Sequence, residues 1–327
     1  MPDKLKIFTG NSNPKLAQDI CAALGVPLGQ AQVAQFEDGE TMVRINENIR
    51  GEDIFVIQPT QSPAVNLMEL LILVDACKRA SARRVTAVVP YFGYARQDRK
   101  DQPRVSITAK LVSNLITVAG ADRVLTMDLH SSQIQCFFDI PFDHLFAAPV
   151  LIEEYKTRKL PNLTVVAPDI GSVKMARAYA KRLGADLALV DKRRPKADSV
   201  EVMNIIGEVK DRTVVMFDDM VTTASTLIEA ARALREAGAR DIFAGITHAV
   251  LCGDSKERIA RSTIREVVVT DTVPHDPATI PGKIKVRSVA PLLAEAVKRI
   301  HTEESLSSLF IDSRAGAPGE ILESPEH

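Results

Sequence analysis

The chain has 327 residues, of which 46% are hydrophobic and 25% are charged. A chain of this length is too long for one small hydrophobic core, so we expect two domains. The composition is that of a soluble globular protein. The formal net charge is −1, so no overall field favours nucleic acid or an anionic membrane, and any phosphate site needs a local basic cluster. We therefore expect neither nucleic acid nor membrane as a partner.

The cysteines are few and lie far apart in the sequence. Cys21, Cys77, Cys136 and Cys252 show no spacing typical of a metal site. Neither a signal peptide nor an apolar run of transmembrane length is visible. These features predict a cytoplasmic protein with free thiols.

Short apolar runs alternate with helical patterns, which is typical of an α/β fold with a mainly parallel sheet flanked by helices. The apolar runs predict strands at residues 41–45, 54–57, 85–89, 124–127, 163–167, 187–190, 213–217, 242–246 and 267–270. The helical patterns predict helices at residues 14–24, 66–81, 107–119, 173–183, 225–237 and 289–300.

The order of elements repeats once. Residues 53–88 and 212–244 both show a strand, a polar turn and a helix, followed by a short basic segment and a second strand. Such self-similarity predicts two tandem copies of one domain fold. We place the domains at residues 1–148 and 149–310. Residues 311–327 mix Gly, Pro, Ser and acids without apolar periodicity, which predicts a disordered tail.

The segment Phe36-Glu37-Asp38-Gly39-Glu40 precedes a predicted strand. It is compatible with a simple turn. Alternatively, the aromatic face and the carboxylates could stack on an adenine and accept from its amino group. The residues alone do not separate these two interpretations.

Basic residues gather in two turn-prone segments, at residues 96–104 and at residues 192–194. Loops of this kind can fold over a polyphosphate and neutralise charge that develops during phosphoryl transfer. Alternatively, these basic residues simply form a solvent-exposed surface.

Acidic and histidine side chains follow two predicted strands. Asp128 and His130 lie two residues apart, so we expect them to point together toward the ligand-binding edge. His130 could ligate a metal or contact a phosphate, or the segment could be a capped turn. Asp169 could hold a Mg²⁺ ion that keeps most of its waters, or it could cap the helix that follows.

The segment from Val214 to Thr226 carries the strongest signal. An apolar run leads into Asp218 and Asp219, then into a loop of small and hydroxyl residues and a helix. Carboxylates at the end of a parallel strand can accept from sugar hydroxyls, and a helix N-terminus suits a phosphate. Taken alone, the segment could also be an ordinary strand, acidic turn and helix. No dinucleotide-binding glycine motif or P-loop motif occurs in the chain.

Together these motifs resemble class I ribose-phosphate diphosphokinases, which are also called phosphoribosyl pyrophosphate synthetases. The most specific pieces are residues 91–100, 128–138 and 191–194, and the resemblance extends over nearly the whole chain. It implies two tandem domains of type I phosphoribosyltransferase fold. It also implies transfer of the β,γ-diphosphoryl group of ATP to the 1-hydroxyl of ribose 5-phosphate, with Mg²⁺ as cofactor.

The resemblance also implies a role for individual residues. Lys192 and Arg194 would be catalytic, and His130 and Asp169 would serve the metal. The residues implied for ATP are Phe36, Asp38, Gly39, Glu40, Arg96 and Gln97, the first four acting across a subunit interface. Those implied for ribose 5-phosphate are Arg194, Asp218, Asp219, Thr222, Thr223, Ala224, Ser225 and Thr226. The expected assembly is a homo-oligomer, a hexamer, with phosphate and ADP as possible effectors.

The chain departs from the family pattern at several positions. Thr222 stands in place of an acid and Ser225 in place of a glycine, and Pro103 and Asn48 replace two serines. A serine at position 225 would be unfavourable if that position required a positive φ. Two alternatives stay open: a non-catalytic regulatory subunit of the enzyme, and a phosphoribosyltransferase.

Overall fold

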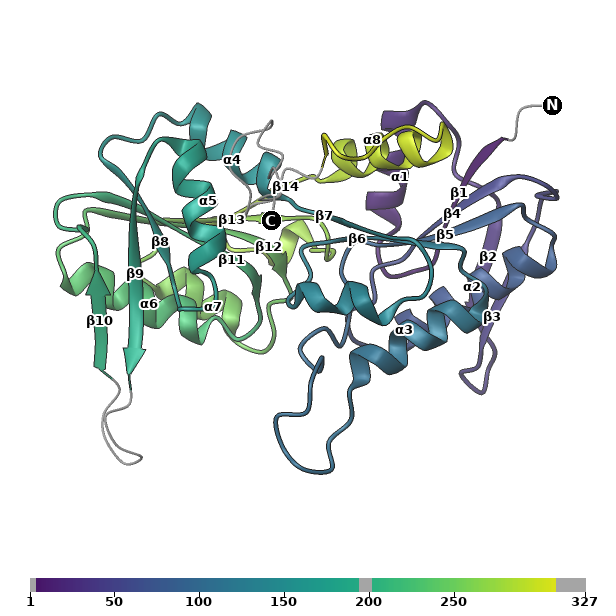
Figure 1. Cartoon of the computed structure of the whole chain (residues 1–327), viewed down its shortest axis with the longest axis horizontal. Helices are drawn as coiled ribbons and strands as arrows, with labels where there is room; N and C mark the ends of the chain where they lie inside the picture. Colours follow the sequence, from purple (N-terminus) through teal and green to yellow (C-terminus); the bar gives the residue numbers. More distant parts are fainter. Residues whose placement is uncertain (1–3, 194–201, 310–327) are drawn as a thin grey trace, which may run out of the picture.

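The structure is a computed structural model that describes residues 4–193 and 202–309. Two sheets lie side by side along an elongated molecule (Figure 1). The first sheet has five parallel strands in the order β1-β4-β5-β6-β7. These strands are β1 (Leu5–Thr9), β4 (Asp53–Ile57), β5 (Arg84–Val89), β6 (Arg123–Met127) and β7 (Phe142–Leu145).

The second sheet has seven strands in the order β10-β9-β8-β11-β12-β13-β14. Only the β10–β9 pair is antiparallel. The strands are β8 (Leu163–Ala167), β9 (Asp186–Arg193), β10 (Val202–Ile206), β11 (Thr213–Val221), β12 (Asp241–Ala249), β13 (Glu266–Thr270) and β14 (Ile284–Arg287). A separate hairpin pairs β2 (Ala31–Gln35) with β3 (Thr41–Ile45).

Helices cover both faces of each sheet. In the orientation of Figure 1, α1 and α8 lie above the first sheet and α2 and α3 below it; α4 and α5 lie above the second sheet and α6 and α7 below it. These helices are α1 (Pro14–Leu24), α2 (Val65–Arg79), α3 (Thr108–Ala119), α4 (Ala148–Thr157), α5 (Val173–Leu183), α6 (Ser225–Glu236), α7 (Ser255–Arg261) and α8 (Ala290–His301). Two 3-10 helices, η1 (Ser132–Phe137) and η2 (Pro277–Thr279), complete the description. No helix among the described residues is long and apolar enough to cross a membrane.

The predicted fold class is confirmed. Each central strand is a continuous apolar run, and all five residues of β4 are buried, as expected for a parallel strand covered on both faces. The repeated segments both form a strand–helix–strand unit with adjacent parallel strands, β4-α2-β5 and β11-α6-β12.

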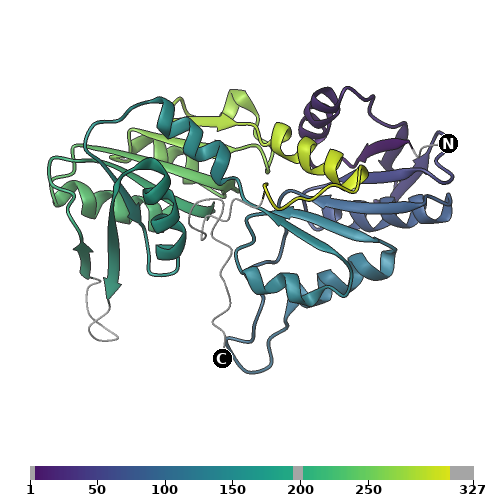
Figure 2. The ribbon, with the colours of Figure 1, turned by 45° about the horizontal axis from the view of Figure 1, so that its top comes forward.

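The last helix returns to the first sheet. Val289, Leu293 and Val297 belong to the same buried cluster as Ile7 and Leu16. Figure 2 shows α8 beside α1, on the first sheet, although it follows β14 of the second sheet in the chain. The segment 149–310 therefore crosses between the two sheets, and the domain limits remain a prediction. The predicted tail, residues 311–327, lies outside the described residues.

All the predicted strands and helices are present, but the sequence analysis missed several short elements. The missed elements are β1, β2, β7, β10, β14, α4 and α7. All but α4 have seven residues or fewer, and all five of the missed strands lie at a sheet edge or in the hairpin. Half-exposed segments of this length carry little apolar periodicity.

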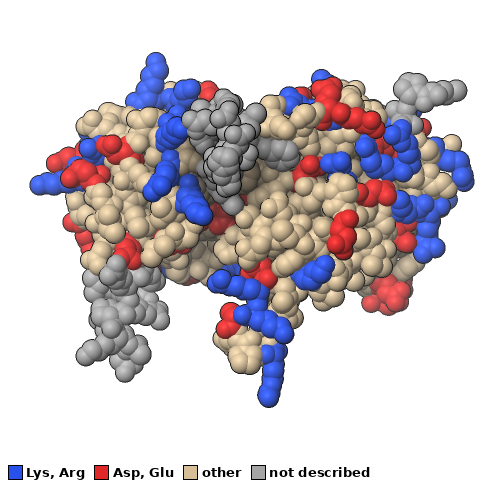
Figure 3. Space-filling view, in the orientation of Figure 1, with Lys and Arg blue, Asp and Glu red and all other residues tan. Residues whose placement is uncertain are grey.

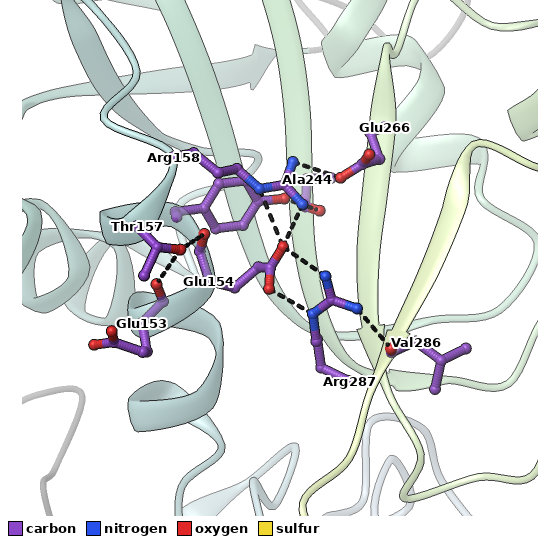
Figure 4. A network of polar contacts seen from close by, with 9 residues as sticks. Glu153, Glu154, Thr157, Arg158, Ala244, Glu266, Val286 and Arg287 are labelled. Atoms are coloured by element: carbon purple, nitrogen blue, oxygen red, sulfur yellow. Dashed lines mark hydrogen bonds and ion pairs between the residues drawn. The ribbon is translucent and has the colours of Figure 1, made fainter.

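An ion-pair network ties α4 to the far edge of the second sheet (Figure 4). The Glu154 carboxylate accepts from Arg158 at the C-cap of its own helix and from Arg287 at the end of β14, with Arg287 Nη2 at 3.0 Å. Arg158 also pairs with Glu266 at the start of β13. The hydrogen bond from Arg287 lowers the pKa of Glu154, although partial burial opposes this shift.

We expect Glu154→Gln to lower the free energy of unfolding at pH 7 by about 1–3 kcal/mol, because Arg287 loses its charged partner and Arg158 keeps only Glu266. Since the folded-state pKa is depressed, the carboxylate stabilises the fold above its unfolded pKa, and this contribution is lost as the pH falls through the folded value. Urea unfolding at pH 7 and near pH 4 measures this dependence. Glu153→Gln, at an exposed position on the same helix, is the control. Equal stability of the two variants at pH 7 would show that the network adds nothing.

Candidate active site

A cavity of about 550 Å³ lies where the carboxyl ends of β6, β8 and β11 approach one another. The first sheet contributes Arg96 and His130 to its lining, and the second contributes Asp169, Asp218 and Asp219. Parallel sheets bind ligands beyond the carboxyl ends of their strands, so the cavity occupies the expected place in both halves of the molecule. Five separately predicted residues therefore meet at one site.

His130 and Asp219 form the direct contact between the two halves of the site. His130 Nδ1 lies 2.9 Å from Asp219 Oδ2. This hydrogen bond raises the pKa of His130 above its ordinary value. Burial alone would raise the pKa of Asp219, but the hydrogen bond and the charge of His130 lower it overall. Each partner therefore favours the charged form of the other.

Asp218 has the opposite electrostatic character. Burial and the adjacent charge of Asp219 raise its pKa well above the ordinary value for a carboxyl group. Its Oδ1 accepts from the backbone N–H of Asp219 at 3.0 Å. Two neighbouring carboxyl groups with divergent pKa values concentrate the negative charge on Asp219, while Asp218 holds a proton more readily.

The sequence analysis placed Asp218 and Asp219 after the predicted strand, but in the structure they lie inside it. β11 continues to Val221, and its pairing with β12 continues to the same residue. Its pairing with β8 ends at Met216. Asp218 and Asp219 therefore lie on a part of β11 that extends beyond its other neighbour, which leaves one side of the strand open to the cavity.

Asp128 lines this cavity together with His130, as expected, but its carboxylate is engaged within the protein. It has a positive φ of 37°, and the residue is 7% exposed. Its Oδ2 accepts from Ala147 N–H at 2.8 Å and from Thr247 Oγ1 at 2.7 Å. The carboxylate thus joins β6, the start of α4 and β12, and holds in place the backbone that carries His130.

His248, on β12, adds further hydrogen bonds to the end of β6. The sequence analysis missed this residue. Its Nε2 lies 3.1 Å from the carbonyl oxygens of both Met127 and Asp128, and its Nδ1 lies 2.9 Å from Thr272 Oγ1. Two acceptors at Nε2 require the proton on that nitrogen. Burial lowers the pKa of His248, so the ring stays neutral. A lone histidine in an apolar strand offers no sequence signal for this role.

The segment Thr222 to Thr226 forms a loop that leads into α6. The positive φ occurs at Ala224, with a value of 61°, and not at Ser225. The serine in place of the family glycine therefore causes no backbone strain. No side chain caps the first turn of α6 within the described structure. The N–H groups of a helix start can then bind an anion, and Thr222 also lines the cavity.

Asp169 lies in the loop between β8 and α5. Its Oδ1 accepts from Ser172 N–H at 2.9 Å, and Ser172 Oγ donates to its carbonyl oxygen at 3.0 Å. These bonds form a local turn, whereas the N-cap position of α5 is occupied by Ser172. The carboxylate lines the cavity and keeps oxygen lone pairs available for a ligand.

The long loop between β5 and α3 forms a second cavity of about 700 Å³, lined by Arg96, Gln97 and His130 among others. Lys and Arg side chains gather on this loop, which projects at the bottom of the molecule in Figure 3. Gln97 Oε1 accepts from Thr108 Oγ1 at 2.6 Å, which ties the loop to the start of α3. A 2.6 Å bond from Gln133 to Asp98 ties the loop to η1.

The structure does not bring the other predicted ATP residues to this site. Phe36, Asp38, Gly39 and Glu40 form the tight turn between β2 and β3, where Gly39 has a φ of 91°. Phe36 is 56% exposed. The hairpin lies at the end of the first sheet remote from the second sheet (Figure 1), and its turn lines neither cavity. The turn interpretation is confirmed, and an adenine role would require a second subunit.

Of the two predicted catalytic residues, Lys192 lies on β9, opposite Met203 of β10. The structure describes its backbone only. Arg194 lies outside the described residues.

The residues present suit Mg²⁺ only in part. No group of three or more His, Cys, Asp or Glu side chains in the described ranges could hold a metal ion by itself. Mg²⁺ needs few protein ligands when substrate phosphates and water complete its octahedron, and it prefers oxygen. The Asp169 carboxylate fits this requirement. His130 fits less well, because its Nδ1 is engaged with Asp219 and its pKa is raised toward the protonated form.

The tandem α/β fold, with acids and a phosphate-type loop at the strand ends, defines a transferase of phosphoribosyltransferase-like fold. Residues 5–120 match the model of the N-terminal domain of ribose phosphate pyrophosphokinase. Residues 190–311 match that of the phosphoribosyl synthetase-associated domain. Together these matches cover more than half of the chain. The chain belongs to the ribose-phosphate pyrophosphokinase family and is an enzyme.

Similar proteins match the chain over nearly its whole length. A ribose-phosphate pyrophosphokinase of Ralstonia nicotianae is 55% identical over 94% of this chain and 98% of its own length. One of Burkholderia pseudomallei is 54% identical over 95% of this chain and 99% of its own. The crystal structure of phosphoribosylpyrophosphate synthetase from Mycobacterium smegmatis superposes with a TM-score of 0.87 at 38% identity. It covers 92% of this chain and 100% of that one.

Proposed function

We propose that this enzyme transfers the β,γ-diphosphoryl group of ATP to the 1-hydroxyl of ribose 5-phosphate at the cavity between the two sheets. The products are 5-phosphoribosyl 1-diphosphate and AMP. The observation that carries this assignment is the 2.9 Å contact between His130 and Asp219. It brings the nucleotide side of the site, on the first sheet, against the sugar side, on the second.

The sugar occupies the second-sheet side in this proposal. Asp218 and Asp219 accept from the ribose hydroxyls, and Thr222 to Thr226 surround the 5-phosphate at the start of α6. A charged Asp219 and a more readily protonated Asp218 suit a pair of hydroxyls, because one group accepts strongly while the other can also donate.

The nucleotide occupies the first-sheet side. Arg96 lines both cavities and can contact phosphates from either one. Gln97 is held toward the same space by Thr108. Phe36, Asp38, Gly39 and Glu40 bind the adenine of an ATP held by a neighbouring subunit, because their hairpin lies away from the cavities of its own chain.

Mg²⁺ bound at Asp169, with His130 nearby, would neutralise phosphate charge and orient the phosphates of ATP. The attacking 1-hydroxyl oxygen forms a bond to the β-phosphorus and loses its proton. The bond from that phosphorus to the α,β-bridging oxygen breaks, and AMP leaves with the electron pair. Lys192 and Arg194 supply positive charge to the transferring group. Phosphoryl-type transfer requires positioning and charge stabilisation more than a covalent nucleophile.

Oxygen labelling tests this reaction directly. ATP that carries ¹⁸O in the α,β-bridging position should give labelled AMP and an unlabelled diphosphate on the sugar, measured by mass spectrometry. Label in the sugar diphosphate would place bond cleavage elsewhere and overturn the proposal. Omission of Mg²⁺ from the same assay tests whether the reaction requires this ion.

Two alternatives remain distinct from this proposal. A non-catalytic regulatory subunit would release no AMP. A phosphoribosyltransferase would consume 5-phosphoribosyl 1-diphosphate and would have no use for the nucleotide-side cavity lined by Arg96 and Gln97. The proposed location of the enzyme is the cytoplasm.

We also propose a homo-oligomer, a hexamer, supported by an apolar stripe on α3. Leu111, Leu115 and Val118 are 54%, 39% and 85% exposed and lie on the face opposite the buried one. Val118→Glu should lower the mass found by sedimentation, because it places a charge where another copy packs. Ile206→Glu, at an apolar residue on β10 that is 57% exposed, is the control. An unchanged mass for Val118→Glu would exclude this face as an interface.

Phosphate and ADP are proposed effectors. The altered position Asn48 forms a local turn, in which its Oδ1 accepts from Arg50 N–H at 3.1 Å, and the Arg50 side chain remains exposed. A cation is thus retained two residues from the altered position. Initial rates measured with and without phosphate, and with added ADP, test both effects.

A further inference from the structure

The loop between β11 and α6 accepts hydrogen bonds from the segment that follows β12. The carbonyl oxygen of Thr222 accepts from Cys252 N–H at 3.0 Å. The carbonyl oxygen of Thr223 accepts from Arg258 Nη1 at 2.9 Å, and Arg258 is a residue of α7. Two successive carbonyl groups of the loop are therefore held by groups that lie about 30 residues further along the chain.

These hydrogen bonds lie next to the strained residue of the loop. Ala224 follows Thr223 directly and has a φ of 61°. A left-handed conformation is unfavourable for a non-glycine residue. Such a conformation persists only when the surrounding contacts impose it. The bond from Arg258 to the preceding carbonyl is one such contact, and it fixes the direction in which the first N–H groups of α6 point.

Ser225 adds a second bond that the family pattern lacks. Arg258 Nη1 lies 3.2 Å from Ser225 Oγ, and this oxygen lies 3.2 Å from Thr223 Oγ1. A glycine at position 225 could supply neither contact. The side chain of Arg258 thus bridges the residues on both sides of Ala224.

The charge of Arg258 is not neutralised by an acid. No Asp or Glu side chain in the described ranges forms an ion pair with it, whereas Arg265 nearby in sequence pairs with Asp241. A cation that contacts the loop through neutral oxygens retains its field for an anion bound at the start of α6.

We propose that Arg258, acting through Thr223 and Ser225, is a positioning residue that shapes the loop for the 5-phosphate of the sugar. The inference rests on the proposed assignment of residues 222–226 to that phosphate. It predicts an effect on ribose 5-phosphate and not on ATP, because Arg258 contacts the loop assigned to the 5-phosphate and does not line the cavity beside Gln97 on the nucleotide side.

Steady-state kinetics of Arg258→Ala should show KM for ribose 5-phosphate raised by about 10- to 100-fold, the loss expected for a charged hydrogen bond. KM for ATP and kcat should change by less than about threefold. Arg258→Lys should give an intermediate KM, since it keeps the charge but not the forked donors. Arg261→Ala, at an exposed position on the same helix, is the control.

A thermal melt of Arg258→Ala distinguishes a positioning role from a role in the stability of the fold. If Arg258→Ala lowers Tm and raises both KM values alike, the residue is merely structural and the proposal is wrong. An unchanged KM for ribose 5-phosphate also overturns it.

Ser225→Asp distinguishes failure of this inference from failure of the site assignment, because it places a negative charge in the loop. If Ser225→Asp raises KM for ribose 5-phosphate and Arg258→Ala does not, only the role of Arg258 is wrong. If neither variant raises it, the loop does not bind the phosphate, and both the assignment and the inference fail.

Discussion

Lys192→Ala is expected to lower kcat by about 10²- to 10³-fold, with little change in stability. Lys192 lies near the end of β9, and the resemblance to the family places its charge on the transferring group. Charge that develops in the transition state is stabilised by a fixed cation, and its removal affects turnover more than substrate binding. Initial rates at saturating ATP and ribose 5-phosphate, together with a thermal melt, measure both effects.

Lys181→Ala is a suitable control for this variant. Lys181 is an exposed residue of α5 in the same half of the molecule, so its removal eliminates one positive charge away from the cavity. It should leave kcat unchanged. If Lys192→Ala keeps most of the turnover of the wild type, the assigned role of this segment is wrong.

The second large effect is expected from Asp219→Asn. We expect kcat/KM for ribose 5-phosphate to fall by about 10²- to 10³-fold, because a charged acceptor for sugar hydroxyls becomes a neutral amide. The same change removes the carboxylate that holds His130 in place. The side chain keeps its size, so the fold should be preserved.

Asp218→Asn should have a smaller effect. Burial and the charge of Asp219 already raise the pKa of Asp218, so a neutral amide resembles the state that this carboxyl group holds more readily. Asp186→Asn, at a side chain 64% exposed, serves as the control. Equal losses for Asp218→Asn and Asp219→Asn would contradict the division of charge between the two acids.

Much of the site was predictable because its signals are local. Asp218 and Asp219 follow a continuous apolar run, and the loop after them leads into an amphipathic helix. The carboxyl ends of parallel strands share one edge, so His130, Asp169 and the acid pair could be expected to meet without knowledge of any distance. The continuous apolar runs of the central strands likewise predicted the parallel sheets.

The remaining features depend on contacts between residues distant in the sequence. Asp128 was predicted to face a ligand and lines the cavity, but its carboxylate also accepts from Thr247, which is 119 residues away, and so connects the two sheets. His248 and Arg258 have no sequence pattern of their own, since their contacts arise only when β12 packs beside β6 and α7 packs beside the loop of residues 222–226. The extension of β11 past Phe217 depends on its neighbours, because only β12 continues beside it.

The measurement that tests the central claim most directly is AMP release from Mg²⁺–ATP by the wild-type enzyme, with and without ribose 5-phosphate. We predict AMP formation that requires the sugar and equals the amount of 5-phosphoribosyl 1-diphosphate produced. AMP release without the sugar, or no AMP under either condition, would contradict the account. The second of these outcomes would identify the chain as a non-catalytic member of its family.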